Sequence, residues 1–413
     1  MRQPWGNIAQ AATISLICLV TCLTTRAWGS TASPLRIYLD ADRTHNQASA
    51  LAIERGLQIA LDEVDNQIQG HPIELIPLDH RGNTRRSKLH MDKALADPNT
   101  LLIMAGLHSP PLIKYRDFIN QNELLTLVPW AAGGPITRYP AAENWIFRLS
   151  VDDTKAGNKL ANFATKTKGC KKPHLLLEQT PWGESNQANL IQAVRQERNA
   201  DPLTSWFNWE VSTESARIML RSIRDLSADC IIYVGNSRDI RTIIEANKTL
   251  AEPLNLPIIS HWGITGGNFE VMVSAEDRDN LDLSFLQTCF SFISSKPTPL
   301  STEVVAKTIE RYADITSASD IKAPTGFIHA YDLGRLLIQA LNQFELSDDT
   351  RTTRAKLRNQ LENITTPVKG LIKTYQQPFR QYSASDTDAH EALGKDDLCM
   401  GRFTDNNDIE LLP

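Results

Sequence analysis

The sequence predicts an α/β protein in which helices cover parallel sheets, because short apolar runs alternate with longer helical patterns along most of the chain. Its 413 residues, 41% of them hydrophobic, exceed the usual size of one domain, so we expect two compact lobes. The formal charge of -5 is spread over interleaved acids and bases, without the basic patch that nucleic-acid binding requires. We therefore expect no nucleic-acid partner.

The expected elements follow one another in two series. In the first series we predict strands at 35–39, 73–78, 101–105 and 124–128, and helices at 47–66, 87–96 and 111–121. In the second we predict a helix at 156–165, strands at 174–178, 206–211, 230–234 and 257–260, and a late helix at 332–344. The polar segment 376–397 is expected to be a loop insertion before a final strand near Arg402.

The first 29 residues have the pattern of an export signal. Arg2 precedes an apolar run without acids from about residue 9 to 23, and small residues follow at 27–29. The run is too short and too often interrupted by Thr and Cys for a membrane span. We therefore expect cleavage after Gly29 and a periplasmic protein, with lipid attachment at Cys22 as the alternative.

The cysteines fit an oxidising compartment. Two of the six lie in the predicted signal, and the other four allow two disulfides in three connectivities. Cys170 and Cys230 precede strands that are expected to be neighbours, which favours a Cys170–Cys230 bond and leaves Cys289 to pair with Cys399. The histidines are scattered without an HExxH motif, so we expect no metal site.

Ligands of open parallel sheets bind where the strands end, because the loops diverge and helix N-termini point outward there. In this chain the rule selects the segments 106–109, 129–132, 180–183, 235–236 and 261–263. Three tryptophans, Trp130, Trp182 and Trp262, recur in them, each beside Gly, Ala or Pro. Aromatic faces with small neighbours suit a concave site for a small organic ligand.

Five motifs in register carry a family resemblance: AGLHS (105–109), VPWAAGGPIT (128–137), FRLSVDDTKAG (147–157), TPWGES (180–185) and HAYDLGRLL (329–337). Together they resemble the type I periplasmic solute-binding proteins of the leucine/isoleucine/valine- and amide-binding branch of ABC-transporter receptors. The resemblance implies two Rossmann-like lobes joined by three hinge crossovers near residues 150, 289 and 367. Lobe 1 would hold 34–150 plus 290–366, and lobe 2 would hold 151–289 plus 367–413.

The resemblance also implies a function. A monomer without a cofactor would capture an amino-acid-like, amide or aromatic molecule between its lobes and present it to ABC permease subunits in the inner membrane. A ligand-sensing or protein-interaction module of the same fold is the alternative. An enzyme is not expected, because no catalytic triad, metal cluster, phosphate loop or carboxylate pair occupies the selected segments.

The site residues implied by the resemblance are Ser109, Trp130, Ala131, Ala132, Asp153, Trp182, Asn236 and Trp262. Ala132 stands where amino-acid binders have a threonine, and Trp262 stands where they have the acid that holds the ligand ammonium. A buried ammonium without a carboxylate partner costs several kcal/mol, so we do not expect an ordinary zwitterionic amino acid.

Five of the implied site residues have a structural alternative that the sequence leaves open. Trp130 would plug the space between loop and helix, and Trp262 would fill the space of the lost acid. Ser109 would cap the helix beginning near Pro110. Asn236 would close a turn, and Asp153 would cap the hinge or contact the other lobe.

Overall fold

The computed structural model describes residue 1 and residues 32–405 and 408–413, so the predicted signal, with Cys18 and Cys22, lies outside the described residues. The strands of the first sheet are β1 (Leu35–Ala41), β2 (Gln67–Ile68), β3 (His71–Asp79), β4 (Thr100–Ala105), β5 (Thr126–Val128) and β6 (Ile146–Arg148). They lie in the order β2-β3-β1-β4-β5-β6, and every pair except the short β2–β3 hairpin is parallel. Parallel pairing follows from the helical crossovers that separate successive strands.

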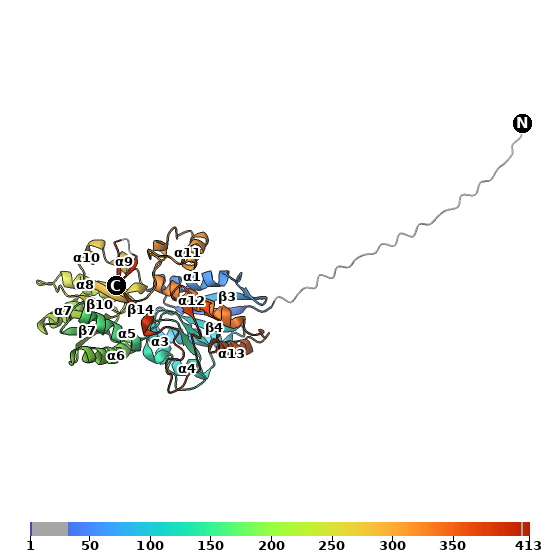
Figure 1. Cartoon of the computed structure of the whole chain (residues 1–413), viewed down its shortest axis with the longest axis horizontal. Helices are drawn as coiled ribbons and strands as arrows, with labels where there is room; N and C mark the ends of the chain where they lie inside the picture. Colours follow the sequence, from blue (N-terminus) through green and yellow to red (C-terminus); the bar gives the residue numbers. More distant parts are fainter. Residues whose placement is uncertain (2–31, 406–407) are drawn as a thin grey trace. The chain divides into compact units, whose positions relative to one another are not determined.

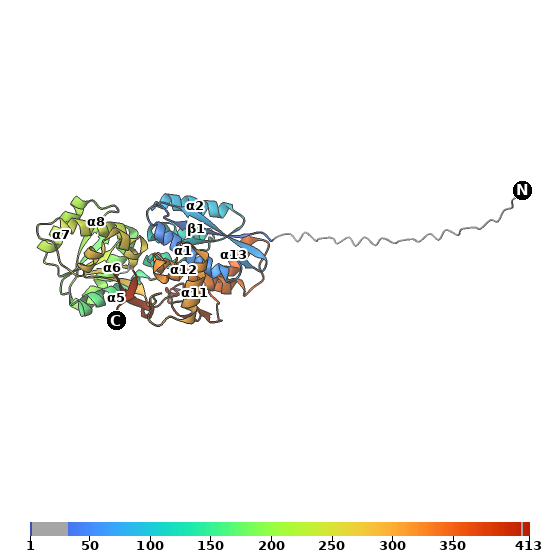
Figure 2. The same ribbon diagram turned by 90° about the horizontal axis from the view of Figure 1, so that it is seen from above.

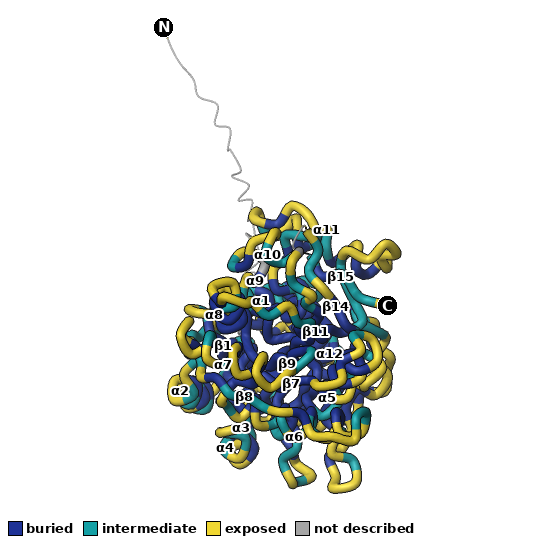
Figure 3. Tube along the Cα trace, turned by 90° about the vertical axis from the view of Figure 1, so that its left-hand side faces the viewer, coloured by how far each residue is buried: buried dark blue, intermediate teal, exposed yellow. Residues whose placement is uncertain are grey.

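The strands of the second sheet are β7 (Pro173–Glu178), β8 (Leu203–Phe207), β9 (Cys230–Val234), β10 (Ile258–Ser260), β11 (Leu283–Thr288), β14 (Leu398–Phe403) and β15 (Ile409–Leu411). Their order is β15-β14-β11-β10-β9-β7-β8, with the C-terminal strands antiparallel at one edge. Strand β9 is buried along its whole length, as central strands of a covered parallel sheet are (Figure 3). A separate hairpin joins β12 (Val368–Lys369) to β13 (Thr374–Tyr375).

The helices are α1 (Gln47–Asp62), α2 (Thr84–Ala96), α3 (Ser109–Lys114), α4 (Arg116–Gln121), α5 (Asp153–Asn162), α6 (Pro181–Arg198), α7 (Thr213–Asp225), α8 (Ser237–Lys248), α9 (Phe269–Met272), α10 (Ala275–Asp279), α11 (Pro299–Arg311), α12 (Pro324–Leu341) and α13 (Thr350–Leu361). The late helices α11, α12 and α13 lie on the side of the first sheet, and α6, α7 and α8 lie on the side of the second (Figures 1 and 2). Within the described residues, no helix is both long and apolar enough to cross a membrane.

Helices α1 and α12 pack closely although about 270 residues separate them in the chain. A Cβ atom on Gly56 would lie 2.1 Å from the backbone oxygen of Phe327, and one on Gly334 would lie 2.8 Å from the Cβ of Ala60. Both glycines are therefore needed for the close approach of the two helix backbones. This contact brings residues 324–341 back to the first sheet.

The α/β class and the succession of predicted strands are confirmed, with shifts at several element boundaries. The helix predicted at 111–121 is two helices that meet at Tyr115, whose φ of -109° is not helical. The helix predicted at 47–66 ends at Asp62 because Asp65 and Asn66 have positive φ. The late helix begins at Pro324 rather than 332, and the strand predicted at 206–211 lies at Leu203–Phe207.

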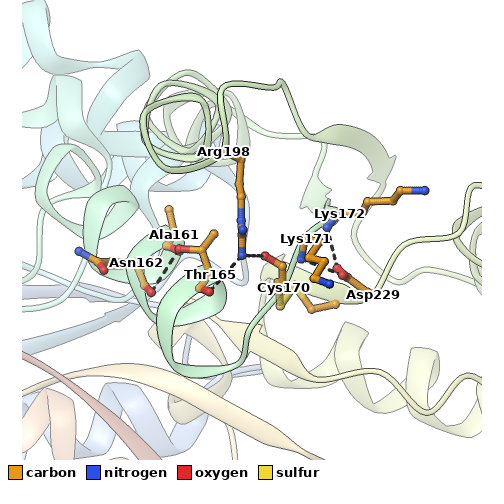
Figure 4. The surroundings of a disulfide bond; sticks show 9 residues. Ala161, Asn162, Thr165, Cys170, Lys171, Lys172, Arg198 and Asp229 are labelled. Atoms are coloured by element: carbon orange, nitrogen blue, oxygen red, sulfur yellow. Dashed lines mark hydrogen bonds between the residues drawn. A yellow bond between two sulfur atoms is a disulfide. The ribbon is translucent and has the colours of Figure 1, made fainter.

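Both predicted disulfides are confirmed. Cys170 bonds to Cys230 and Cys289 bonds to Cys399, with Cα–Cα distances of 5.9 and 5.0 Å. Around the first bond, Arg198 donates to the backbone oxygens of Thr165 and Cys170 (Figure 4). The Cys170–Cys230 bond therefore joins the segment before β7 to the first residue of β9, at the amino ends of these neighbouring strands.

Candidate ligand-binding site

The loop that carries Trp130 follows β5 and is held by a buried arginine. Arg148, at the end of β6, is fully buried, and its Nη1 donates to the backbone oxygens of Ala131 (3.1 Å) and Gly133 (2.9 Å). Its Nε and Nη2 donate to both carboxylate oxygens of Glu391 at 2.6–3.0 Å. A charged side chain thus fixes an irregular loop whose carbonyl groups would otherwise lack partners.

Glu391 belongs to the polar segment 376–397 that the sequence predicts as a loop insertion. The segment has little regular structure, and its backbone joins β6 through hydrogen bonds from Arg148 N to His390 O and from Ala392 N to Arg148 O. The His390 ring stacks on Phe147 at a centroid distance of 3.8 Å. Through Glu391 and Arg148, the insertion therefore holds the Trp130 loop in place. The sequence did not predict this role.

Trp130 is buried, with 1% of its surface exposed. Its ring lies against Gly326, where a Cβ atom would come within 2.5 Å of the indole. The ring also meets Trp262, from the loop after β10 of the second sheet, with centroids 6.3 Å apart and planes at 63°. Aromatic pairs prefer this edge-to-face arrangement. The two tryptophans thus join the strand-end loops of both sheets.

On the second sheet, the rings of His261 and Trp182 extend the contact between Trp130 and Trp262. His261 lies between the two remaining tryptophans, with its centroid 6.2 Å from Trp262 and 5.1 Å from Trp182. Trp182, near the start of α6, donates its Nε1 to Asp153 Oδ1 at 3.1 Å. We call Trp130, Trp182, His261 and Trp262 the aromatic cluster. It brings together the three tryptophans singled out in the sequence.

Asp153 is fully buried beside the aromatic cluster. Its Oδ2 accepts from the backbone of Gly134 (3.3 Å), its own backbone N–H donates to Ala132 O (3.0 Å), and Asp152 rather than Asp153 is the N-cap of α5. Asp153 therefore links the Trp130 loop to Trp182 and does not cap the hinge helix.

Ser109 contacts the Trp130 loop through its side chain. Its Oγ accepts the backbone N–H of Gly133 at 3.0 Å, while His108 is the N-cap of α3. The alternative that Ser109 caps α3 is therefore not what the structure shows, because the Ser109 hydroxyl accepts the N–H group of the loop. Ala131 and Ala132 are buried, and their small side chains leave the loop backbone free to meet Arg148 and Asp153.

A second polar group that sequence reasoning missed surrounds Glu178, the last residue of β7. The carboxylate accepts from Thr180 Oγ1 (2.6 Å), Trp209 Nε1 (3.0 Å) and Asn236 Nδ2 (3.1 Å). Burial raises the pKa of Glu178 to about 8, because the low-dielectric interior disfavours its charged form. Asn236 therefore supports Glu178 and makes no side-chain cap on α8.

A third contact between the loops of the two sheets lies at His108. Its ring meets Trp209, from the loop after β8, at a centroid distance of 5.0 Å, and its Nε2 lies 3.3 Å from Asp42 Oδ2. Residues from seven strand ends of the two sheets, β1, β4, β5, β7, β8, β9 and β10, thus converge on the aromatic cluster and its polar neighbours. In parallel sheets this edge is where ligands bind.

The comparisons with known proteins agree with this architecture. A model of the family described as periplasmic binding protein matches residues 39–381. A type 1 periplasmic binding protein from Bordetella pertussis Tohama I superposes with a TM-score of 0.75 and 16% identity, over 92% of this chain and 100% of that one. No curated protein matches the chain.

Two further solved structures were determined with ligands. The branched-chain amino acid transporter substrate-binding protein LivJ from Streptococcus pneumoniae, in complex with isoleucine, has a TM-score of 0.71 and 16% identity, covering 92% of this chain and 99% of that one. A solute-binding protein of an ABC transporter from R. palustris, in complex with 4-hydroxybenzoate, has a TM-score of 0.69 and 14% identity, covering 91% and 95%. The family model covers most of the sequence and the structural matches share its two-sheet architecture. The chain therefore belongs to the periplasmic binding protein family and has the type I fold.

Proposed function

We propose that the protein captures a small organic ligand between its two lobes and presents it to the permease subunits of an ABC transporter. The lobes are residues 34–150 plus 290–366 and residues 151–289 plus 367–413. The observation that carries the proposal is the contact of Trp130 with Trp262, because it joins strand-end loops of both sheets at the edge where parallel sheets bind ligands. Hinge motion of the lobes would open and close this contact.

The ligand-binding residues in this proposal are Ser109, Trp130, Ala131, Ala132, Asp153, Trp182, Asn236 and Trp262. Their surroundings favour an amide, an aromatic molecule or another weakly charged molecule over a zwitterionic amino acid. Ala132 offers a methyl group where a hydroxyl would hold a carboxylate, and the Trp262 ring fills the place of an acid. Isoleucine and 4-hydroxybenzoate are ligands of the neighbours described above, and they show the size of molecule that this fold accommodates.

The rest of the proposal concerns the setting of this activity. The protein acts in the periplasm as a monomer, after removal of residues 1–29, and it needs no cofactor. Its role is binding rather than catalysis. The two disulfides support this setting, because such bonds form and persist in oxidising compartments.

Calorimetry and thermal-shift screening of the protein purified from the periplasm test the proposal. The library holds amino acids, amides, aromatic acids and amines, and a ligand that binds only the native state raises the melting temperature. Trp130→Ala should weaken binding at least tenfold. The matched control is Trp145→Ala, because Trp145 is also buried but stands at the start of β6, away from the aromatic cluster. Circular dichroism verifies that both variants fold.

Two results would refute the proposal. One is a library in which no compound raises the melting temperature or gives a heat of binding. The other is a ligand whose affinity is the same for Trp130→Ala and for Trp145→Ala, since such a ligand would bind elsewhere.

A further inference from the structure

Two buried nitrogen atoms in the aromatic cluster have no hydrogen-bond partner in the part of the chain that the structure describes. They are Trp130 Nε1, from a loop of the first sheet, and His261 Nε2, from a loop of the second. Both rings flank Trp262, at centroid distances of 6.3 and 6.2 Å. Leaving a donor unpaired in the interior costs about 1–3 kcal/mol, so a ligand that supplied an acceptor to these two donors would recover that cost.

The hydrogen bonds of His261 decide which of its nitrogens carries the proton. Its Nδ1 accepts the backbone N–H of Trp262 at 3.0 Å, so Nδ1 has no proton. The neutral ring therefore carries its proton on Nε2, which makes Nε2 a donor. Nε2 lies 3.2 Å from Asp153 Oδ1, but without the alignment of a hydrogen bond. Trp130 Nε1 can only donate. Both unpartnered atoms are thus donors that call for an acceptor.

The charges around these donors disfavour an anionic acceptor. Asp153 is fully buried, and among the described residues no lysine or arginine pairs with its carboxylate. Within residues 32–405 and 408–413, the hydrogen-bond donors to Asp153 are the neutral groups Trp182 Nε1 and Gly134 N. A ligand carboxylate on His261 Nε2 would lie about 5 Å from Asp153, and at an effective dielectric of about 20 this repulsion corresponds to roughly a hundredfold loss of affinity.

We propose that Trp130 and His261 donate hydrogen bonds to uncharged oxygen atoms of the ligand, and that Asp153 makes the site select an uncharged oxygen over a carboxylate. The inference rests on the proposed function, since it assumes that the ligand lies at the aromatic cluster. It adds His261 as a specificity-determining residue. It also separates this protein from relatives whose ligands, isoleucine and 4-hydroxybenzoate, carry carboxylates.

The position of the two donors distinguishes them from the unpartnered nitrogen of another buried histidine, His174. His174 Nδ1 is also buried without a partner, but His174 stands near the start of β7, at the amino end of the sheet. Its other nitrogen contacts Ser205 Oγ at 2.9 Å. His174 is therefore a matched control: a histidine of equal burial with an unpartnered nitrogen, remote from the strand ends that form the site.

Matched pairs of ligands that differ in one group test the proposal by calorimetry. Benzamide is compared with benzoate, and isovaleramide with isovalerate, together with the amide and acid counterparts of every compound found in the library. We expect the amide of a pair to bind at least about a hundredfold more tightly than the acid. Asp153→Asn keeps an oxygen for Trp182 but removes the charge, so it should reduce this ratio at least tenfold.

Substitutions at the donors test their direct role. Trp130→Phe keeps an aromatic ring without the N–H group and should weaken amide binding about five- to tenfold, the usual effect of one hydrogen bond. Trp145→Phe, its control, should leave binding unchanged. His261→Gln should alter the amide-to-acid ratio, whereas His174→Gln should not, even where both lower the melting temperature.

The outcomes separate this inference from the proposed function. If the acids bind as tightly as the amides, the inference is wrong while ligand capture stands. The same holds if Trp130→Phe binds like Trp145→Phe. If no compound binds at all, both proposals fail.

Discussion

Replacing Glu391 by glutamine should destabilise the protein strongly, because Glu391 neutralises the buried Arg148. The carboxylate accepts from Arg148 Nε and Nη2 and from Thr137 Oγ1, and both charged side chains are inaccessible to solvent. Glutamine has nearly the same shape, so packing is preserved. The change removes the negative charge and turns an N–H₂ group toward a guanidinium that can only donate.

The size of the effect follows from what Arg148 retains. Removing one partner of a buried ion pair costs about 3–5 kcal/mol. Arg148 still has Asp152 Oδ1 at 3.2 Å and the two loop oxygens, which places the expected loss at the lower end, about 3 kcal/mol. Since the same arginine holds Ala131 and Gly133, we also expect weaker ligand binding from a loosened Trp130 loop.

Urea denaturation followed by circular dichroism measures this loss. Glu410→Gln is the matched control, because Glu410 pairs with Arg402 on the surface, where the two side chains are 46% and 58% exposed. An exposed pair contributes about 0–1 kcal/mol, so this variant should unfold almost like the wild type. If Glu391→Gln and Glu410→Gln lose the same stability, the buried pair does not hold the insertion to β6.

Three further predictions concern pH, close packing and the disulfides. Burial raises the pKa of Glu178 from 4.5 to about 8, so the native state keeps a proton that the unfolded chain releases; stability should fall by on the order of 4 kcal/mol as the pH rises from about 4.5 to 8. Glu178→Gln should abolish this component, and unfolding curves at pH 5.5 and pH 8 that shift equally for wild type and variant would contradict it. Gly56→Ala should cost more than 2 kcal/mol in denaturant unfolding, because its Cβ would lie 2.1 Å from the Phe327 backbone oxygen, whereas Gly394→Ala, with its nearest contact at 3.8 Å, should be neutral. Replacing Cys170 and Cys230 together by alanine should lower stability by about 4 kcal/mol, as expected for opening a loop of about 60 residues, and an unchanged urea midpoint would show that the bond does not constrain the unfolded chain.

The sequence predicts the class of the fold and the place of its strands because buried parallel strands must be apolar runs. Residues 230–234 form one such run, and the strand has the same bounds. The same logic predicts the Cys170–Cys230 bond, since the amino ends of neighbouring parallel strands meet, and the second bond follows as the remaining pair. Tyr115 shows where periodicity fails. The adjoining Arg116 donates to the backbone oxygens of Pro135 and Arg138, a tertiary contact that no local pattern contains.

The candidate site is predicted in its location but only partly in its members. The three tryptophans meet because each follows a strand of a parallel sheet. The sequence did not predict Glu178 as a site residue, although it is the last residue of a predicted strand. A charged residue at the end of a buried parallel strand could have indicated a site residue. Arg148 has a similar signal, a lone charge after the apolar residues 145–147. The pairing of Arg148 with Glu391, 243 residues away, depends on the folded chain alone.

Because of the two disulfides, the stability of the fold depends on whether the four cysteines are oxidised. They close loops of about 60 and 110 residues, and together such loops contribute about 9 kcal/mol. The net stability of a whole protein is about 5–15 kcal/mol. A chain whose four cysteines are reduced would therefore keep only a small part of this stability. Both bonds lie in the proposed lobe 2, so the redox state of the compartment sets how stable that lobe is.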